Sequence, residues 1–390
     1  MSAGELERCD VAVVGGGPVG LYLGAELTER GMDCRVLESR RAPAPHSRSI
    51  GIHPPALGRL ARLGLDERLK EEAVAIRRGH AIGERGRLGT VRFDRCPPPF
   101  PYILAIPQHR TESVLARFLE ERARGVLWRG YRVTACRAEG PETRLSWQGP
   151  SGESGELRCR VVVGCDGKDS LVRKAMGGTF RGGPYPDRYV MGDFEDNTDL
   201  GADAAVYLPR EGLIESFPLP HGRRRWVVKT DTRNEPPDRA VIDEAVRAWL
   251  GHELDSAACH MTSAFGVGRY LAAPMAGPGW ALAGDAAHIV SPIGGQGMNL
   301  GWLDAAELAE RLGRAGPRTQ RRQRELADYN RHRRAVARRS ARRALLNMAL
   351  GRARREPTAR DLAVRAMLRW PLSPLTARIF AMHGIESWPI

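Results

Sequence analysis

The feature that most constrains the fold is the spacing Gly15-x-Gly17-x-x-Gly20, which lies between the apolar run VAVV and the helical pattern LYLGAEL. Gly15 permits a tight turn, Gly17 lets the backbone approach a pyrophosphate, and Gly20 lets the helix pack closely on the strand. The N-terminus of that helix offers free N–H groups to phosphate oxygens. Glu38 ends the next predicted strand, where a carboxylate binds both hydroxyls of an adenosine ribose. Because we expect no arginine beside the ribose, the pattern predicts an unphosphorylated ribose, and by itself it fits either NAD or FAD.

A second glycine-rich segment, GDAAHIVSPIGGQGMNLG at residues 284–301, favours FAD over NAD. The buried run WALAGD delivers Asp285 to the carboxyl end of a strand, where α/β sheets bind ligands. The loop SPIGGQG exposes bare backbone, against which a flat ring can lie. The helix that follows directs its positive end at that ring, which favours the negative charge of a reduced flavin. The two loops therefore predict one FAD, with adenosine at residues 15–38, isoalloxazine at residues 285–299, and Asp285 on the ribityl hydroxyls.

The rest of the chain predicts an α/β protein whose Rossmann-like FAD-binding domain is discontinuous. Residues 181–267 contain short alternating segments with frequent proline and glycine, which indicates a mixed or antiparallel sheet inserted into that domain. We expect a C-terminal helical segment interrupted at Pro371 and Pro374. The predicted division is an FAD-binding domain of residues 1–75, 100–180 and 268–345, a substrate-binding sheet domain of residues 76–99 and 181–267, and a helical segment of residues 346–390.

The net charge of +14 is concentrated in one part of the sequence. Residues 311–360 contain 17 arginines and three acidic residues, which by subtraction gives +14 for this stretch alone. Residues 321–352 predict a helix with an arginine-rich, solvated outer face, on which we place Arg321, Arg333 and Arg342. Binding of a polyanion such as nucleic acid is the alternative interpretation. The inner face of this helix is expected to carry the apolar residues Leu326, Tyr329, Val336, Leu345 and Met348.

The seven cysteines are scattered and never spaced C-x-x-C, so the sequence predicts neither a disulfide framework nor a metal site. The chain has no apolar run of membrane-spanning length. Its N-terminus continues into the first glycine loop and reads as a first strand rather than a signal peptide. These features predict a cytoplasmic protein without a membrane span.

Three stretches together resemble one family. They are the glycine fingerprint ending at Glu38, VVVGCDGKDSLVRKAMG at residues 161–177, and GDAAHIVSPIGGQGMNLGWLDAAEL from residue 284. The chain resembles the single-component FAD-dependent aromatic hydroxylases with the p-hydroxybenzoate hydroxylase fold, over residues 8 to about 345. The segment VYLPREGLIESFPLPHGRRRWVV is similar to the substrate-domain sheet of that family.

The resemblance implies positions for further residues. Arg48 and Gln108 would face the flavin and its ribityl–phosphate stretch, and Val133 would lie near adenine. Asp166 would lie near the pyrophosphate groove and the approach of the nicotinamide donor, although its alternative role is to cap the helix that follows. The complete set expected to bind the cofactor is Gly15, Gly17, Val19, Gly20, Glu38, Arg48, Gln108, Val133, Asp166, Gly284, Asp285, Pro292, Gly295, Gly297, Met298 and Asn299. Pro292 would lie beside the reactive edge of the ring, and the backbone of residues 297–299 would bind its pyrimidine edge.

The implied reaction is hydroxylation of an aromatic or phenolic small molecule by a monooxygenase that uses NAD(P)H and O2, through a flavin hydroperoxide. Because the non-covalent FAD carries the chemistry, we assign no catalytic side chain, and we expect His288 to pack behind the ring or to hydrogen-bond the loop. The expected partners are the aromatic substrate, O2 and transient NADPH or NADH, with no nucleic acid, and the protein is expected to be a monomer or homodimer. Same-fold alternatives are an epoxidase, a Baeyer–Villiger oxygenase or a halogenase, whose WxWxIP stretch the sequence lacks. An FAD-containing nucleic-acid-binding protein is a further alternative.

Three departures from the family pattern stand out. Lys168 and Asp169 occupy positions where the family has small or arginine residues, which is expected to alter docking of the nicotinamide donor. The helix after the flavin loop contains AELAERL, which is more polar than usual, so we expect its outer face to be exposed. No thioredoxin-like sequence follows, although many relatives from polyketide pathways carry such a domain.

Overall fold

The computed structural model describes residues 7–44, 48–230, 238–255, 258–291, 295–316, 318–352 and 358–386. Its first sheet is parallel through its centre, as the near-continuous apolar runs VAVV and VVV predict for strands buried on both faces. The strands, in spatial order, are β17 (Ala276–Gly277), β18 (Trp280–Leu282), β11 (Ser154–Gly164), β1 (Glu7–Val14), β2 (Cys34–Glu38) and β8 (Leu127–Arg129). Two antiparallel strands, β10 (Glu142–Gln148) and β9 (Arg132–Glu139), continue from β11.

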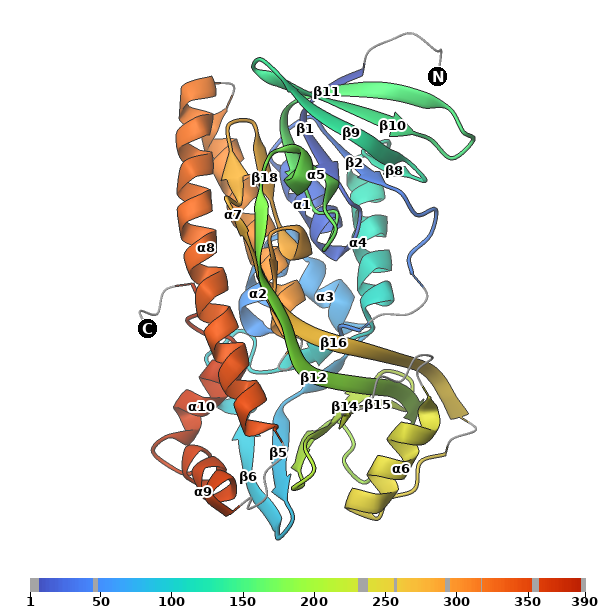
Figure 1. The fold of residues 1–390 in the computed structure, drawn as a ribbon, viewed down its shortest axis with the longest axis vertical. Coiled ribbons are helices and arrows are strands. Elements are labelled where there is room, and N and C mark those ends of the chain that lie inside the picture. The colour runs from blue at the N-terminus through green and yellow to red at the C-terminus, as the bar shows by residue number, and fades with distance from the viewer. Residues whose placement is uncertain are drawn as a thin grey trace.

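Alternate residues of β1 enter two different apolar cores. Val11 and Val13 pack with helices on one face of the sheet, whereas Ala12 and Val14 pack with Trp147 of β10 on the other. The helices on the first face include α1 (Pro18–Glu29), α4 (Gln108–Arg122) and α7 (Gln296–Ala315). The small helix α5 (Leu171–Ala175) lies on the second face. The parallel sheet thus forms the central layer of the upper half of the molecule (Figure 1).

The inserted sheet predicted from the alternating segments is present and is mixed. Its strands, in spatial order, are β19 (His288–Ile289), β16 (Cys259–Ala273), β12 (Thr179–Glu195), β15 (Arg223–Thr230), β14 (Ile214–Leu219), β13 (Ala204–Leu208), β5 (Arg78–Gly83) and β6 (Gly86–Arg92). Only the β13–β5 pair is parallel among these described strands. The long strands β12 and β16 run from the first half of the molecule into the second (Figure 1).

One face of this second sheet is covered by α6 (Arg239–Leu250), which packs on Val190, Trp226 and Val228. The other face is turned toward the C-terminal helices α9 (Thr358–Met367) and α10 (Ser373–Phe380). A third, small sheet joins the halves through β3 (Gly51–Ile52), β7 (Ile103–Ala105) and β4 (Val74–Ile76). The helices α2 (Pro54–Leu60) and α3 (Leu65–Lys70) lie between β3 and β4 in the chain.

The arginine-rich stretch forms the predicted helix, α8 (Thr319–Leu350), which runs along both halves of the molecule (Figure 1). Leu326, Tyr329, Val336 and Met348 are buried as expected, and Leu345 is half-buried. The placement of Arg333 on the outer face was wrong. The Arg333 side chain is fully buried. Its charge is compensated there by the carboxylates of Asp304 and Glu386, which lie 2.6 and 3.0 Å from its guanidinium nitrogens. Arg321 and Arg342 are exposed, as predicted.

The expectation that the outer face of α7 is exposed was also wrong. Helix α8 covers that face, so Asp304 is inaccessible and Glu307 is almost buried. The polar residues of AELAERL form ion pairs within α7, with α8, and with Arg59 and Arg62. Glu307 accepts a hydrogen bond from Arg311 at 2.8 Å and lies 2.7 Å from a ring nitrogen of His332. Ion pairs with a second helix therefore replace the predicted contact with water.

The predicted C-terminal helices are α9 and α10, and Pro374 lies in the first turn of α10. The sequence-based division at residue 345 falls inside α8, since that helix continues to Leu350. No helix in the described part of the chain combines the length and the apolar character needed to cross a bilayer.

Candidate functional site

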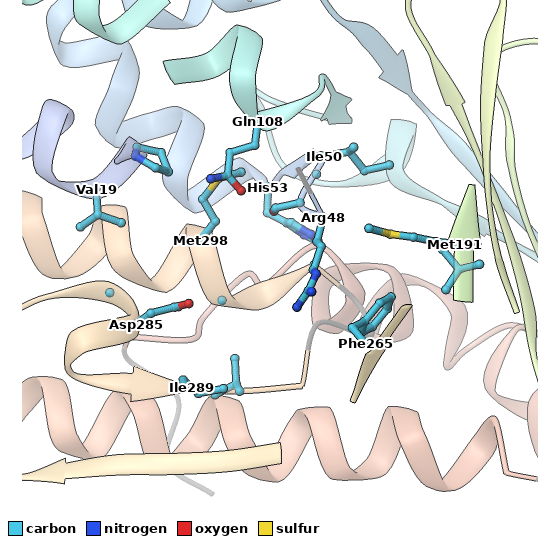
Figure 2. Close-up of a pocket in the computed structure, with 18 of the residues that line it drawn as sticks. Val19, Arg48, Ile50, His53, Gln108, Met191, Phe265, Asp285, Ile289 and Met298 are labelled. Atoms are coloured by element: carbon cyan, nitrogen blue, oxygen red, sulfur yellow. The ribbon is translucent and has the colours of Figure 1, made fainter. Parts of the chain in front are cut away.

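A single cavity of about 1100 Å³ extends from the first glycine loop to the face of the second sheet. In Figure 2, Val19 and Asp285 lie toward one end of this cavity, Met191 and Phe265 toward the other, and Arg48 lies between them. The predicted cofactor residues that line it are Gly15, Gly17, Val19, Glu38, Arg48, Gln108, Val133, Asp166, Gly284, Asp285, Gly295, Gly297 and Met298. Residues from widely separated parts of the sequence thus share one cavity.

The first glycine loop has the geometry that a phosphate-binding turn needs. Gly15 has φ +102°, a conformation that favours glycine, and a Cβ there would overlap the backbone of Cys165. A Cβ on Gly20 would overlap the carbonyl oxygen of Gly15, so Gly20 serves packing and does not line the cavity. A Cβ on Gly17 would meet no protein atom within 4 Å. No side chain caps the N-terminus of α1, so its N–H groups face open cavity beside Gly17.

Glu38 is held at the end of β2 by donors from both sides. Its Oε2 accepts from the Gly16 N–H at 2.7 Å, and its Oε1 accepts from the backbone N–H and Nε of Arg40 at 2.8 and 2.9 Å. Burial alone would raise the pKa of Glu38, but these hydrogen bonds outweigh it and hold the pKa below its ordinary value. Glu38 is therefore an anionic acceptor at physiological pH.

The expectation that no arginine lies beside the ribose position was wrong. Arg40 lines the cavity next to Glu38, and its guanidinium also lies 3.6 Å from Glu112 on α4. Glu112 accepts a hydrogen bond from the Nε2 of Gln108 at 2.8 Å, which orients the Gln108 side chain. The arginine is engaged by two carboxylates, so its charge does not create a dedicated phosphate site at this end.

Asp166 contacts the helix that follows it and also lines the cavity. Its Oδ2 accepts from the backbone N–H of Val172 at 3.1 Å, which satisfies one free donor of α5. Ser170 caps the same helix by accepting from the Arg173 N–H at 3.0 Å. The other Asp166 oxygen, Oδ1, is buried without a hydrogen-bond partner among the described residues, and Asp166 lines the cavity. Asp166 therefore belongs both to the start of α5 and to the wall of the cavity.

At the second loop, Asp285 follows β18 and presents its side chain to the cavity. Helix α7 begins at Gln296 after Gly295, whose φ is +67°, and no side chain caps this end. Gly297 and Met298 of its first turn line the cavity. Pro292 lies outside the described residues.

Asn299 does not line the cavity but fixes the shape of this loop. Its Oδ1 accepts from the His53 N–H at 2.8 Å, and its Nδ2 donates to the carbonyl oxygens of Gly51 and Gly295 at 2.9 and 2.7 Å. The side chain therefore joins α7 to the segment around β3. This role differs from the predicted backbone contact with the ring.

His288 is buried behind the loop. Its Nε2 lies 2.6 Å from Oδ2 of Asp304, and the same carboxylate accepts from the Gly284 N–H at 3.1 Å. His288 does not line the cavity. The geometry gives it a structural contact with α7, not a position from which it reaches a substrate.

The middle of the cavity is built around two arginines. The Arg48 guanidinium lies 5.8 Å from the centroid of the Phe265 ring. Arg225 forms a two-point ion pair with Asp193 at 2.6 and 2.8 Å and donates to the Arg48 carbonyl oxygen at 2.8 Å. Arg225 therefore holds the backbone that carries Arg48 against the second sheet.

The far end of the cavity is apolar and was not predicted residue by residue. Most of its lining comes from alternate residues of the second sheet and from the C-terminal helices, including Met191, Val206, Phe217, Val227, Phe265, Val364, Met367 and Phe380. One carboxyl group, that of Glu215, lies among them, and burial raises its pKa to about 7. The alternation in IESFPL places Glu215 and Phe217 on one face of β14, but only the assembled sheet shows that this face meets the cavity.

The groups that line the cavity fit a long, two-ended nucleotide cofactor. An uncapped helix N-terminus lies at each loop, Gly17 leaves the phosphate position open, and the carboxyl groups of Glu38 and Asp285 belong to residues that line the cavity. Comparison with known proteins identifies the cofactor. The model of the FAD-binding domain family matches residues 8–344. The chain belongs to this FAD-binding family.

Known relatives share this fold. The chain is 34% identical over 313 residues to rifampicin monooxygenase from Streptomyces venezuelae, a match that covers 78% of this chain and 63% of the relative. The structure of OxyS anhydrotetracycline hydroxylase from Streptomyces rimosus is 29% identical and superposes with a TM-score of 0.75, covering 96% of this chain and 76% of that one. The p-nitrophenol 4-monooxygenase PnpA from Pseudomonas putida has a TM-score of 0.85 at 23% identity, over 99% and 100% of the two chains, and shows the fold alone.

The chain spans less than two thirds of the length of curated relatives that it matches, such as 63% of the rifampicin monooxygenase. The family membership fixes FAD as the cofactor of this site. The activity and the substrate are inferred below from the chain's own cavity together with these relatives.

Proposed function

We propose that this chain is a FAD-dependent monooxygenase that uses NAD(P)H and O2 to hydroxylate an aromatic or phenolic small molecule, in secondary metabolism or aromatic catabolism. The observation that carries the proposal is the continuity of the cavity, which passes from the FAD loops directly onto an apolar sheet face. Relatives named as monooxygenases and hydroxylases support the same reaction class. Bound FAD would supply the redox and oxygen-transfer chemistry, while this chain supplies position and a dry pocket.

The proposed FAD contacts follow the two loops. The N–H groups at Gly17 would bind the pyrophosphate, and anionic Glu38 would accept the adenosine ribose hydroxyls, with Val133 close to adenine. Asp285 would accept ribityl hydroxyls. At the other end, the uncapped N–H groups of α7 at Gly297 and Met298 would donate to the pyrimidine edge of the ring, which favours its reduced, anionic form.

We further propose that the nicotinamide donor binds only transiently, since the sequence has one dinucleotide fingerprint and FAD occupies it. Asp166 and the neighbouring Asp169, which both line the cavity, would lie where such a donor approaches. The ammonium group of Lys168 lies 5.8 Å from the Tyr270 ring centroid, and its side chain is exposed. Its positive charge would therefore lie on the surface beside the path of the donor. The substrate would lie between the second sheet and the loop that precedes α7.

We also propose separate roles for the two halves of the molecule. Residues 1–75, 100–180 and 268–345 would bind FAD, and residues 76–99 and 181–267 would supply the sheet that binds substrate. The C-terminal helices α9 and α10 would close the substrate end, because Val364, Met367 and Phe380 line the cavity there.

Anaerobic stopped-flow absorbance tests this proposal. The FAD-loaded protein is mixed with NADPH or NADH, with and without a set of phenols. We expect slow bleaching of the flavin by the nicotinamide alone and marked acceleration by a suitable phenol. If neither nicotinamide reduces the flavin with any phenol, while a separate flavin reductase restores turnover, the single-component assignment is wrong.

A further inference from the structure

The substrate end of the cavity contains one carboxyl group in an apolar row of the second sheet. Glu215 of β14 lies directly opposite Val206 of β13 and Val227 of β15. Val227 in turn lies opposite Met191 of β12. Glu215, Val206, Val227 and Met191 all line the cavity, so the carboxyl group faces the same space as its apolar neighbours.

The Glu215 carboxyl group has no partner in the described protein. Its side chain is 92% buried, since only 8% of the residue is exposed, and no described residue donates a hydrogen bond to it or forms an ion pair with it. Tyr189, with which it interacts electrostatically, is itself buried. An acidic group in this position is normally stabilised by a donor, and the protein offers none.

Two further ionisable groups that line the cavity near Glu215 are already paired. His80 has Asp203 at 3.0 Å from one ring nitrogen and Thr90 at 3.2 Å from the other. Arg225 is paired with Asp193. Among the described residues that line the substrate end, Glu215 is therefore the acidic group left for a ligand, while the cation Arg48 lies nearer the middle of the cavity, over the Phe265 ring.

We propose that Glu215 determines substrate specificity, by accepting a hydrogen bond from a hydroxyl or amino group at the end of the aromatic substrate that lies away from FAD, and by disfavouring ligands that carry a carboxylate there. The inference rests on the proposed function, because its ligand is the substrate of that reaction. The aromatic character follows from the lining, which includes Phe217 and Phe265 beside the aliphatic row. A hydroxyl or amino donor satisfies the carboxyl group, whereas a second carboxylate would repel it.

The test uses equilibrium binding to the FAD-loaded protein at about pH 8, where Glu215 is mostly ionised. The probes are 2-naphthol, 2-methoxynaphthalene and 2-naphthoate, which share one ring system and differ in the donor or charge that they present. Binding is followed by the change in FAD absorbance. The variants are Glu215→Gln and Glu215→Leu, with Glu211→Gln as the matched control, because Glu211 is exposed on the turn before β14.

We expect wild-type protein to bind 2-naphthol about tenfold more tightly than 2-methoxynaphthalene, as one hydrogen bond to a charged group implies. Glu215→Leu should abolish this preference, and Glu215→Gln should improve binding of 2-naphthoate by about tenfold. Glu211→Gln should change neither ratio.

Equal ratios in wild type and both Glu215 variants, or the absence of binding of every probe to wild type, would overturn the inference. If Glu215→Leu fails to retain FAD, the inference is tested by Glu215→Gln alone, and unchanged binding of 2-naphthoate to that variant would overturn it. Binding needs neither NAD(P)H nor O2. A shift in probe preference without any nicotinamide-dependent reduction would therefore reject the proposed function and leave the ligand preference of Glu215 standing.

Discussion

Replacing Arg333 by methionine removes a charge from the most deeply buried ionic cluster of α8 while preserving most of the side-chain volume. Arg333 donates to Asp304 at 2.6 Å, and neither side chain is accessible to solvent. Burial would raise the pKa of Asp304, but His288 and Arg333 outweigh burial and lower it, so the carboxylate stays ionised. The variant therefore leaves a buried negative charge without its main counter-charge.

The structure sets the size of the effect. Removing one partner of a buried ion pair costs about 3–5 kcal/mol. Asp304 keeps His288 at 2.6 Å, and Glu386 keeps Arg59 at 3.4 Å, so the loss belongs at the lower end, about 3 kcal/mol. Arg342 on the same helix is exposed, and Arg342→Met should change stability by less than about 0.5 kcal/mol.

The assay is urea and thermal unfolding of the FAD-loaded proteins, with saturating FAD in every sample. Arg333→Met should unfold at clearly lower urea concentration and temperature than both wild type and Arg342→Met. The double variant Arg333→Met with Asp304→Asn should lose less stability than the sum of the two single variants, since the unpaired charge is gone. Equal stability of Arg333→Met and Arg342→Met would show that the buried ion pair of Arg333 with Asp304 does not stabilise the fold.

Three further predictions concern the cavity. Folding raises the pKa of Glu215 from 4.5 to about 7. As pH rises from 4.5 to 7, the unfolded chain loses the Glu215 proton before the folded protein does, so the free energy of unfolding falls over this range. Glu215→Gln should then gain about 3 kcal/mol of unfolding free energy above pH 7 and nothing below pH 4.5, and a pH-independent difference would contradict this. Gly17→Leu should fold but be purified colourless, without FAD, because its side chain would fill the phosphate position. Gly20→Leu, by contrast, should fail to fold, because its side chain would overlap the backbone of Gly15. Yellow Gly17→Leu protein would argue against this site. Asp166→Ala should slow flavin reduction by NAD(P)H more than it lowers FAD content, and equal losses would assign Asp166 to FAD binding or folding alone.

The sequence predicted those parts of the fold that local pattern determines. The strand–glycine loop–helix at residues 11–29 and the loop at residues 284–301 are recognisable because several of their glycines meet a local backbone requirement, such as φ +102° at Gly15 and φ +67° at Gly295. The alternating segments likewise predicted a separate mixed sheet. Residues 292–294 of the second loop, with Pro292, lie outside the described part of the chain, and the proposed place of Pro292 beside the ring stays a prediction.

The errors came from contacts between residues distant in the sequence. Arg333 was assigned to the surface because the helical pattern alone does not reveal Asp304, 29 residues earlier, or Glu386, 53 residues later. Arg40 was overlooked although it follows Glu38 by two residues, because its guanidinium turns back onto that carboxylate only in the folded loop. Glu215 could be assigned to a strand face, but the cavity on that face depends on β5 pairing beside β13.

The reaction proposed for this chain is the transfer of one oxygen atom from O2 to an aromatic ring. The most direct measurement is mass spectrometry of the product formed from the phenol that best accelerates flavin reduction, with the reaction run under ¹⁸O2 in ordinary water. The account predicts a hydroxylated product that carries one labelled oxygen atom. Consumption of NAD(P)H that yields only hydrogen peroxide with every phenol tested, or a product whose new oxygen comes from water, would contradict it.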